Sequence, residues 1–240
     1  MSNAVKQARE TRVNLHTDMN TKITFLSIAT LLSFFPAFGE TKPSPASDAR
    51  LAALRELKIN AATITQVERD PSATRTIVKL VLRPAKGSNI NVEVWLPDAE
   101  KWNARFLGLG NGGAAGKINS GSLAGVSAAG YAVATTDMGT APNPDSGVGN
   151  PEVWKDFGFR ATHIMTVAAK QIVRAHYGKD PEFSYFSGGS TGGQQALQEA
   201  QRYPEDYDGI AAAVAAHCRT PLHAYFLWND QILKKCPFTK

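Results

Sequence analysis

The sequence contains few of the residues from which metal sites are built. Its 240 residues include two cysteines, Cys218 and Cys236, and five histidines. A zinc or iron–sulfur site needs clustered cysteine or histidine ligands, and His217 and His223 do not complete such a set. We therefore expect the chain to hold no metal and no cofactor.

The chain also lacks a large excess of charge of one sign. The formal net charge is +5, and the lysines and arginines are scattered, with no basic run beside stacking aromatic residues. Nucleic-acid binding therefore has little support. Hydrophobic residues make up 43% of the chain, which is enough for one domain with a substantial core.

One stretch is apolar enough to suggest a targeting role. Lys22 precedes an apolar run of 13 residues over positions 23–35. This run is shorter than the roughly 20 residues that span a bilayer, and it suits the core of a signal peptide. Ala37 and Gly39 place small residues at the −3 and −1 positions of a cleavage site. A buried core helix is the alternative.

These features predict a signal peptide over residues 1–39 and a linker over 40–49. Met19 is a plausible start, which would make residues 1–18 an upstream extension. We expect a secreted or periplasmic protein with no membrane attachment after cleavage. In an oxidising compartment Cys218 and Cys236 are a candidate disulfide, and two unpaired thiols are the alternative.

Apolar patterning over the remaining residues, 50–240, predicts an α/β sheet that is antiparallel at its start and parallel afterwards. Ile90, Val92, Val94 and Leu96 alternate with more polar residues, as in a half-buried strand. The later apolar runs are short and continuous, as in buried parallel strands. The expected strands are 76–82, 90–96, 105–109, 131–136, 183–187 and 209–215, and the expected helices are 49–57, 157–177 and 191–202.

A glycine–serine motif lies between an expected strand and an expected helix. Gly188, Ser190 and Gly192 form the Gly-x-Ser-x-Gly pattern of a nucleophile elbow. The serine must sit on a strained turn, and flanking glycines remove side chains that would clash there. The following helix directs backbone N–H groups, that of Thr191 first, at a developing oxyanion. An ordinary glycine-rich turn is the alternative.

A second glycine-rich stretch follows the strand over 105–109. Its glycines include Gly112 and Gly113, in the place from which this kind of hydrolase takes a second oxyanion donor. Gly108, Gly110 and Gly113 also match the Gly-x-Gly-x-x-Gly dinucleotide pattern, but the residues that follow are a poor helix start. A purely structural loop is a further alternative.

Four segments resemble the tannase/feruloyl esterase family. The likeness covers about residues 50–240, and its matching segments are Val92–Pro97, Arg105–Gly113, Ala134–Gly139 and Gly189–Gly209. The resemblance implies an α/β-hydrolase that cleaves esters of plant phenolic acids, with a large lid inserted before its last triad members. It implies Ser190 as the nucleophile, with the Thr191 N–H and the Gly112/Gly113 loop as oxyanion donors.

The sequence departs from the family pattern in two ways. Many members have a cysteine just before the nucleophile, bonded to one beside the catalytic histidine, whereas this chain has Gly189. In the family, the triad acid and histidine lie beyond the lid, well after the nucleophile. We therefore expect that the triad Asp and His are not present in this chain, and that it is the N-terminal part of the enzyme, truncated before the lid and last strands. A lid calcium site found in some members would lie beyond Lys240.

Other polar residues are assigned structural roles. His217 and His223 are weak candidates for a base, because the order after Ser190 does not match the triad. Asp137 is interpreted as a structural hydrogen-bonding group. His163 and His176 are interpreted as packing or surface residues, and the remaining acidic residues as solvated helix-end and turn charges: Glu199, Glu205, Asp206 and Asp208.

The leading hypothesis is a secreted serine carboxylesterase that forms an acyl-enzyme on Ser190 and is inactive as this piece alone. Its partner would be a small aromatic ester, and the oligomeric state is open. A non-catalytic ester-binding protein that lost its triad is the second hypothesis. A dinucleotide-binding oxidoreductase is the third.

The signal-peptide interpretation predicts that the exported protein begins at Glu40, since cleavage would follow Gly39. N-terminal sequencing of protein recovered from the medium or periplasm checks this. An uncleaved chain retained in the cytoplasm would contradict the prediction.

Overall fold

A computed structural model describes residues 45–70 and 74–236. The expected signal peptide over 1–39 lies outside the described residues. The expected linker over 40–49 is wrong at its end, because helix α1 begins at Pro45.

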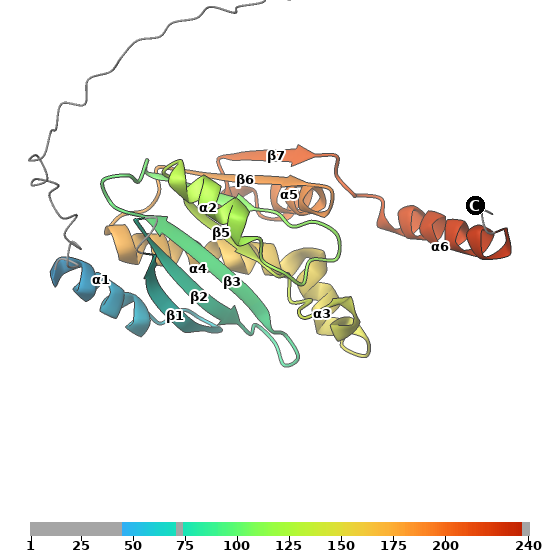
Figure 1. Cartoon of the computed structure of the whole chain (residues 1–240), viewed down its shortest axis with the longest axis horizontal. Coiled ribbons are helices and arrows are strands. Elements are labelled where there is room, and N and C mark those ends of the chain that lie inside the picture. The colour runs from blue at the N-terminus through green and yellow to red at the C-terminus, as the bar shows by residue number, and fades with distance from the viewer. Residues whose placement is uncertain (1–44, 71–73, 237–240) are drawn as a thin grey trace, which may run out of the picture. The chain divides into compact units, whose positions relative to one another are not determined.

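The described chain forms a seven-stranded sheet with the order β1-β2-β3-β5-β4-β6-β7 (Figure 1). The strands are β1 Ala62–Asp70, β2 Arg75–Leu82, β3 Ile90–Pro97, β4 Arg105–Leu109, β5 Ala132–Thr136, β6 Phe183–Gly189 and β7 Gly209–Ala213. The helices are α1 Pro45–Glu56, α2 Ser120–Ala128, α3 Pro151–Lys155, α4 Ala161–Tyr177, α5 Thr191–Arg202 and α6 Arg219–Lys235. Short turns of helix are η1 Pro144–Gly147, η2 Asp156–Arg160 and η3 Pro204–Asp206.

The sheet changes direction part-way across, as the sequence predicts. β1, β2, β3 and β5 pair antiparallel, and the expected hairpin of β2 with β3 has Leu82 opposite Ile90. β5, β4, β6 and β7 pair parallel. Since β4 lies between β5 and β6, the loops that leave the carboxyl ends of these three strands meet at one edge of the sheet.

Helices cover both faces of the sheet. α4 and α5 pack on one face and α2 on the other (Figure 1). The main core includes Phe106 and Phe186 from the sheet and Met165 and Ile172 from α4, all fully or almost fully buried. Gly178 ends α4 in the left-handed conformation that glycine adopts most readily.

Several elements differ from the sequence prediction. β1, α2 and α6 were not expected, because their residues lack a clear apolar period. The helix expected from residue 157 becomes α-helical at Ala161, after the wider π-helical turn η2. α5 ends at Arg202, before Tyr203-Pro204, as expected from the restriction that proline places on the preceding residue.

The expected disulfide is contradicted. Cys218 and Cys236 are free and exposed, and they cap opposite ends of α6. A helix of 17 residues is about 25 Å long. The Cα atoms of a disulfide lie within about 7 Å of one another, so these two thiols cannot pair in this structure.

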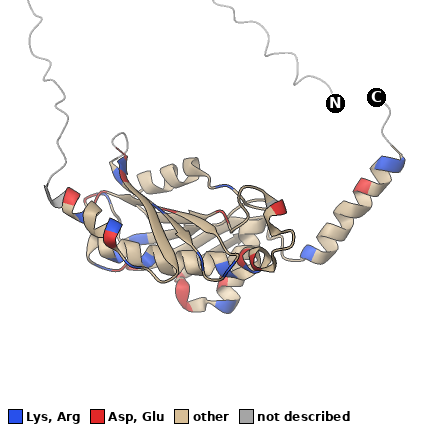
Figure 2. Ribbon diagram, turned by 90° about the horizontal axis from the view of Figure 1, so that it is seen from below, with Lys and Arg blue, Asp and Glu red and all other residues tan. Residues whose placement is uncertain are grey.

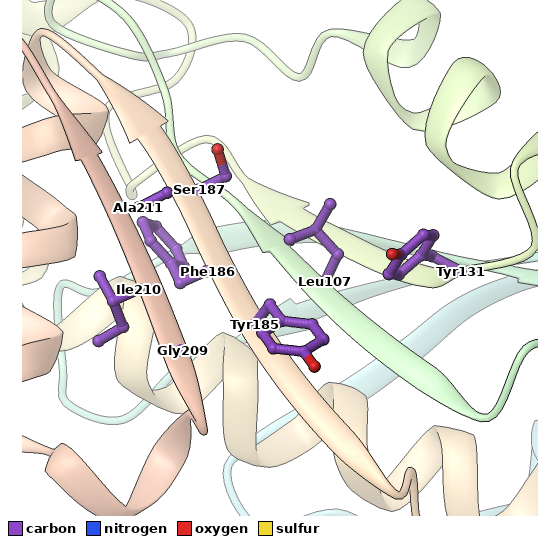
Figure 3. A pocket seen from close by; sticks show the side chains of 8 residues that line it. All are labelled: Leu107, Tyr131, Tyr185, Phe186, Ser187, Gly209, Ile210 and Ala211. Atoms are coloured by element: carbon purple, nitrogen blue, oxygen red, sulfur yellow. The ribbon is translucent and has the colours of Figure 1, made fainter.

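Within residues 45–70 and 74–236, no helix covers one part of the parallel sheet. Leu107 of β4 and Tyr185 of β6 are register partners, and with Ser187 they point into an open apolar hollow of about 360 Å³ (Figure 3). α6 extends away from the sheet (Figure 1). It exposes large apolar side chains, including Phe226 and Trp228.

Charged residues and helix hydropathy can be followed in the described part of the chain. Acidic and basic residues intermingle over the helices and loops (Figure 2). Among the described helices, none is both long enough and apolar enough to cross a bilayer.

The buried His176 on α4 makes stability depend on pH. Burial, with a smaller effect from Arg50 and Arg69, lowers the pKa of His176 from 6.5 to about 4. A lowered folded-state pKa means that the unfolded chain binds the proton more tightly, so stability is lost as pH falls through this range. The loss between pH 6.5 and 4 is at most about 3 kcal/mol.

We expect His176→Leu to flatten the decline in unfolding free energy between pH 6.5 and 4, because leucine cannot gain a proton. Urea unfolding of both chains at several pH values measures this, with the exposed His223→Leu as control. Equal pH slopes for His176→Leu and the unaltered chain would contradict the prediction.

Candidate active site

Ser190 lies on a strained turn between β6 and α5. Its φ is 56° and its ψ is −116°, a combination that non-glycine residues rarely adopt. Three backbone hydrogen bonds hold it there. The Ser190 N–H donates to Ala213 O at 3.1 Å, and Ser190 O accepts from the Ala216 N–H at 2.9 Å and from the Gln194 N–H at 3.1 Å. The residue is exposed, so the turn presents its hydroxyl to solvent.

The glycines around Ser190 are required by close backbone contacts. A Cβ on Gly188 would lie 2.4 Å from Gly192 O, and one on Gly193 would lie 2.5 Å from Ala213 O. Across the site, a Cβ on Gly110 would lie 2.6 Å from Gly192 Cα. Since real Cβ atoms do not approach backbone atoms this closely, no larger residue fits these positions without a shift of the turn.

The second glycine-rich stretch packs directly against this turn. The Thr191 hydroxyl donates to Gly113 O at 2.6 Å, and the Asn111 N–H donates to Gln195 Oε1 at 3.1 Å. The Asn111 amide also donates to Thr136 O at 2.5 Å, which anchors the loop to β5. The structure therefore brings Ser190, Thr191, Gly112 and Gly113 into one region of the molecule, as the sequence predicts.

Three backbone N–H groups near Ser190 are available as donors. Among the described residues, those of Gly112 and Gly113 have no hydrogen-bond partner. The N–H of Thr191 opens α5, where the first turn of a helix leaves its donors unpaired. Such donors can stabilise a negative oxygen. Their role as an oxyanion hole stays a prediction.

Arg219 is a site residue that the sequence analysis missed. Its Nε donates to Gln194 Oε1 and its guanidinium to the Thr191 hydroxyl, both at 2.7 Å. The guanidinium carbon also lies over the Phe157 ring, 5.4 Å from the ring centre. No local signal marks this arginine, because it follows Thr191 by 28 positions and reaches it only through the turn after β7.

No histidine is bonded to the Ser190 hydroxyl among the described residues. His217 donates from Nδ1 to Ala215 O at 3.0 Å, and His223 lies exposed on α6 beside Phe226. The described part of the chain therefore presents an exposed serine on a strained turn beside backbone N–H donors, and no triad is assembled among these residues.

Asp137 has the structural role assigned to it. Its carboxylate accepts hydrogen bonds from the Asn91 amide at 2.5 Å, from the Asn91 N–H and from the Gly139 N–H, which ties β3 to the end of β5. Burial raises its pKa while these hydrogen bonds oppose the shift.

Glu199 is not the solvated charge expected from the sequence. It lies fully buried on the face of α5 that also buries Gln195 and Ala196, at helical spacing. Burial and the nearby Asp206 raise its pKa to about 8. Asp206 is half-buried and bonded to His163, so this charge is also less solvated than expected, and Glu205 is exposed as expected.

Asp208 is anchored as well. Its carboxylate accepts a hydrogen bond from the Ser184 N–H at 2.7 Å, which fixes the start of β7 beside β6. It is exposed, in agreement with its interpretation as a turn charge.

The dinucleotide alternative is not supported. Gly108 lies within β4, and the next helix, α2, begins only at Ser120. A dinucleotide site needs a tight turn straight into a helix whose N-terminus holds the pyrophosphate. The glycine-rich stretch of this chain instead packs against the turn that carries Ser190.

Comparison with known proteins decides the family. The family model described as tannase and feruloyl esterase matches residues 75–232, which include Ser190 and both glycine-rich stretches. This chain belongs to the tannase and feruloyl esterase family.

Curated relatives agree with this assignment to the family. The chain is 39% identical over 140 residues to a probable feruloyl esterase B-2 of Aspergillus flavus, covering 58% of this chain and 26% of that protein. It is 37% identical over 145 residues to feruloyl esterase B of Aspergillus niger, covering 59% and 27% respectively. The chain thus spans about a quarter of the length of these tannase and feruloyl esterase relatives.

Solved structures confirm the α/β-hydrolase fold. Feruloyl esterase B from Aspergillus oryzae superposes with a TM-score of 0.62 at 27% identity, over 70% of this chain and 37% of that one. Tannin acyl hydrolase from Aspergillus niger gives 0.54 at 25% identity, over 68% and 35%. The tannase and feruloyl esterase fold therefore accounts for the antiparallel-then-parallel sheet.

We expect Gly188→Ala to destabilise the chain by at least about 2 kcal/mol, because the new Cβ meets the carbonyl of Gly192. Gly125→Ala is the matched control: Gly125 lies in α2 with nothing within 4 Å of a new Cβ. That change should stabilise the chain by about 0.5–1 kcal/mol. Urea unfolding followed by circular dichroism measures both, and equal effects would contradict the prediction.

Proposed function

We propose that this chain supplies the nucleophile and the oxyanion hole of an exported serine carboxylesterase that acts on esters of phenolic acids. The observation that carries the proposal is the exposed, strained Ser190, whose turn packs against the Gly110–Gly113 loop at Gly110 and Gly192, where a side chain on Gly110 would not fit. The family assignment and the names of the feruloyl esterase and tannin acyl hydrolase relatives support the substrate class.

The proposed reaction proceeds through an acyl-enzyme. Ser190 Oγ attacks the ester carbonyl carbon and passes its proton to a histidine base. The N–H groups of Thr191, Gly112 and Gly113 stabilise the tetrahedral oxyanion. The ester C–O bond then breaks, and the alcohol leaves with the proton. Water attacks the acyl group and releases the phenolic acid, which restores the serine.

Arg219 is proposed to position this machinery. It holds the Thr191 hydroxyl, which in turn holds Gly113 O, so a single chain of hydrogen bonds joins α6, the elbow and the oxyanion loop. Its role is to fix two of the donors relative to each other, since misplaced donors lose most of their stabilising effect.

A non-catalytic ester-binding protein is the second candidate. The observation that favours it is the absence, among the described residues, of an imidazole bonded to Ser190 Oγ. Such a protein would keep the elbow and the donors but would release no acid.

We expect the 240-residue chain alone to hydrolyse methyl ferulate and methyl gallate negligibly, because a serine hydroxyl without a base is a weak nucleophile. In the protein encoded by the complete reading frame, Ser190→Ala should lower turnover by at least about 10⁴-fold while leaving folding intact. Ser122→Ala, an exposed change on α2, is the control and should leave turnover unchanged.

Two outcomes would overturn parts of the proposal. If the complete protein binds aromatic esters without hydrolysing them, the ester-binding candidate is correct. If the 240-residue chain turns over esters at enzyme-like rates and His217→Ala removes that activity, His217 is the base.

A further inference from the structure

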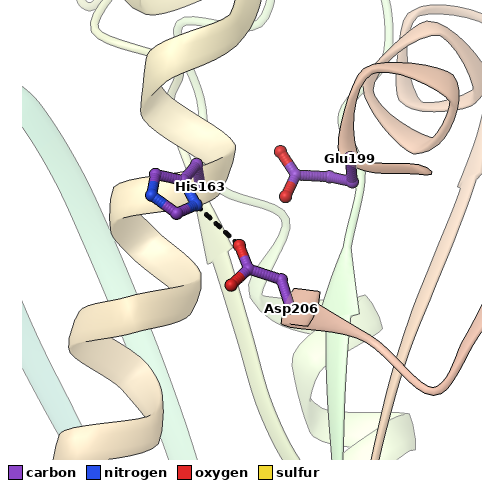
Figure 4. A group of neighbouring side chains, drawn as sticks. All are labelled: His163, Glu199 and Asp206. Carbon is purple, nitrogen blue, oxygen red and sulfur yellow. Dashed lines mark hydrogen bonds and ion pairs between the residues drawn. The ribbon is translucent and has the colours of Figure 1, made fainter. Parts of the chain in front are cut away.

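Three metal-binding side chains converge away from Ser190. His163 comes from α4, Glu199 from α5 and Asp206 from the turn η3, and one ligand atom of each lies within 4.8 Å of the other two. Figure 4 shows the Glu199 carboxylate directed at the space beside His163 and Asp206.

The Glu199 carboxylate is the group that requires an explanation. It is fully buried, and no donor group reaches either of its oxygens among the described residues. The polar group that it faces is another carboxyl, that of Asp206, which raises the pKa of Glu199. Lys170, the nearby ammonium, donates instead to the backbone oxygen of Asp206. A buried carboxylate without a partner is costly, so a cation is the natural complement.

We propose that His163, Glu199 and Asp206 bind a divalent transition metal ion, with Zn²⁺ as the best match. One imidazole nitrogen and two carboxylate oxygens are ligands that zinc accepts, and two carboxylates balance its charge. A fourth position is open to water, since the side chains of His163 and Asp206 are 30% and 15% exposed.

The geometry needs a small rearrangement to hold the ion. Ligands about 2.0–2.2 Å from a tetrahedral zinc ion lie about 3.3 Å apart. His163 Nδ1 and Asp206 Oδ2 are now 2.6 Å apart and share a hydrogen bond. On binding, the Glu199 carboxyl releases its proton to solvent and coordinates as a carboxylate. The proton on Nδ1 of His163 moves to Nε2 as Nδ1 coordinates the ion, and His163 and Asp206 separate slightly.

The surroundings already orient the imidazole. Tyr203 stacks on His163, with ring centres 3.7 Å apart and planes 10° from parallel. Glu199 lies toward the end of α5 that is remote from Ser190. Zinc would therefore link the end of α5 to α4 and stabilise the helix that begins beside Ser190. It would take no part in the reaction at Ser190.

The test uses the full 240-residue chain, prepared without an affinity tag and stripped with a chelator. We expect calorimetry to show one Zn²⁺ bound per chain, with a rise in Tm. Co²⁺ should give the visible spectrum of a tetrahedral site. Glu199→Gln should weaken zinc binding by at least about 100-fold, since even the loss of a supporting hydrogen bond costs 10- to 100-fold.

Matched controls separate this site from chance binding. Glu205→Gln, an exposed neighbour on η3, and His223→Asn on α6 should bind zinc as the unaltered chain does. His163→Asn should lose it.

The proposal is wrong if the unaltered chain binds no zinc, or if Glu199→Gln binds it equally well. It is also wrong if binding depends instead on the exposed His217 and Cys218. If Glu199→Gln raises the Tm above that of the unaltered chain and zinc changes the Tm of neither, the buried group is a protonated carboxyl and not a metal ligand. None of these results depends on ester hydrolysis, so the site and the proposed function stand or fall separately.

Discussion

The close approach of backbone to backbone at Gly110, Gly188 and Gly192 is the constraint on which the rest of the site depends. It brings the end of β4, the end of β6 and the start of α5 closer together than any side chain would allow. Ser190 can then occupy a left-handed, strained conformation with its hydroxyl outward. Such strain costs on the order of 1–3 kcal/mol and persists only where the surroundings enforce it.

The surroundings of Ser190 enforce its conformation from three directions. The turn after β7 bonds both backbone groups of Ser190, and the loop after β4 bonds the Thr191 side chain. Arg219, at the start of α6, donates a hydrogen bond to the Thr191 hydroxyl. Because these contacts come from three separate loops, the position of the nucleophile is determined by the sheet rather than by the motif alone.

Two of the buried carboxylates, Asp137 and Glu199, have contrasting surroundings. Asp137 lies close to the site, and several amide donors satisfy it, so its burial is matched by hydrogen bonds that join two strands. Glu199 lies at the far end of α5 and has no such donors among the described residues. The contrast explains why the same residue type acts as a structural link in one place and as a candidate ligand in the other.

Local sequence determined the hairpin of β2 and β3, the end of α5 at Arg202 and the turn at Ser190, because alternation, proline and glycine act on their nearest neighbours. The family likeness rested on the same short segments. Tertiary structure alone decided that β4 lies between β5 and β6, that Arg219 reaches Thr191 and that Glu199 is buried beside His163. It also separated Cys218 from Cys236, because the residues between them form a helix instead of a closed loop. Those outcomes depend on which elements pack together, and the spacing of residues along the chain does not contain that information.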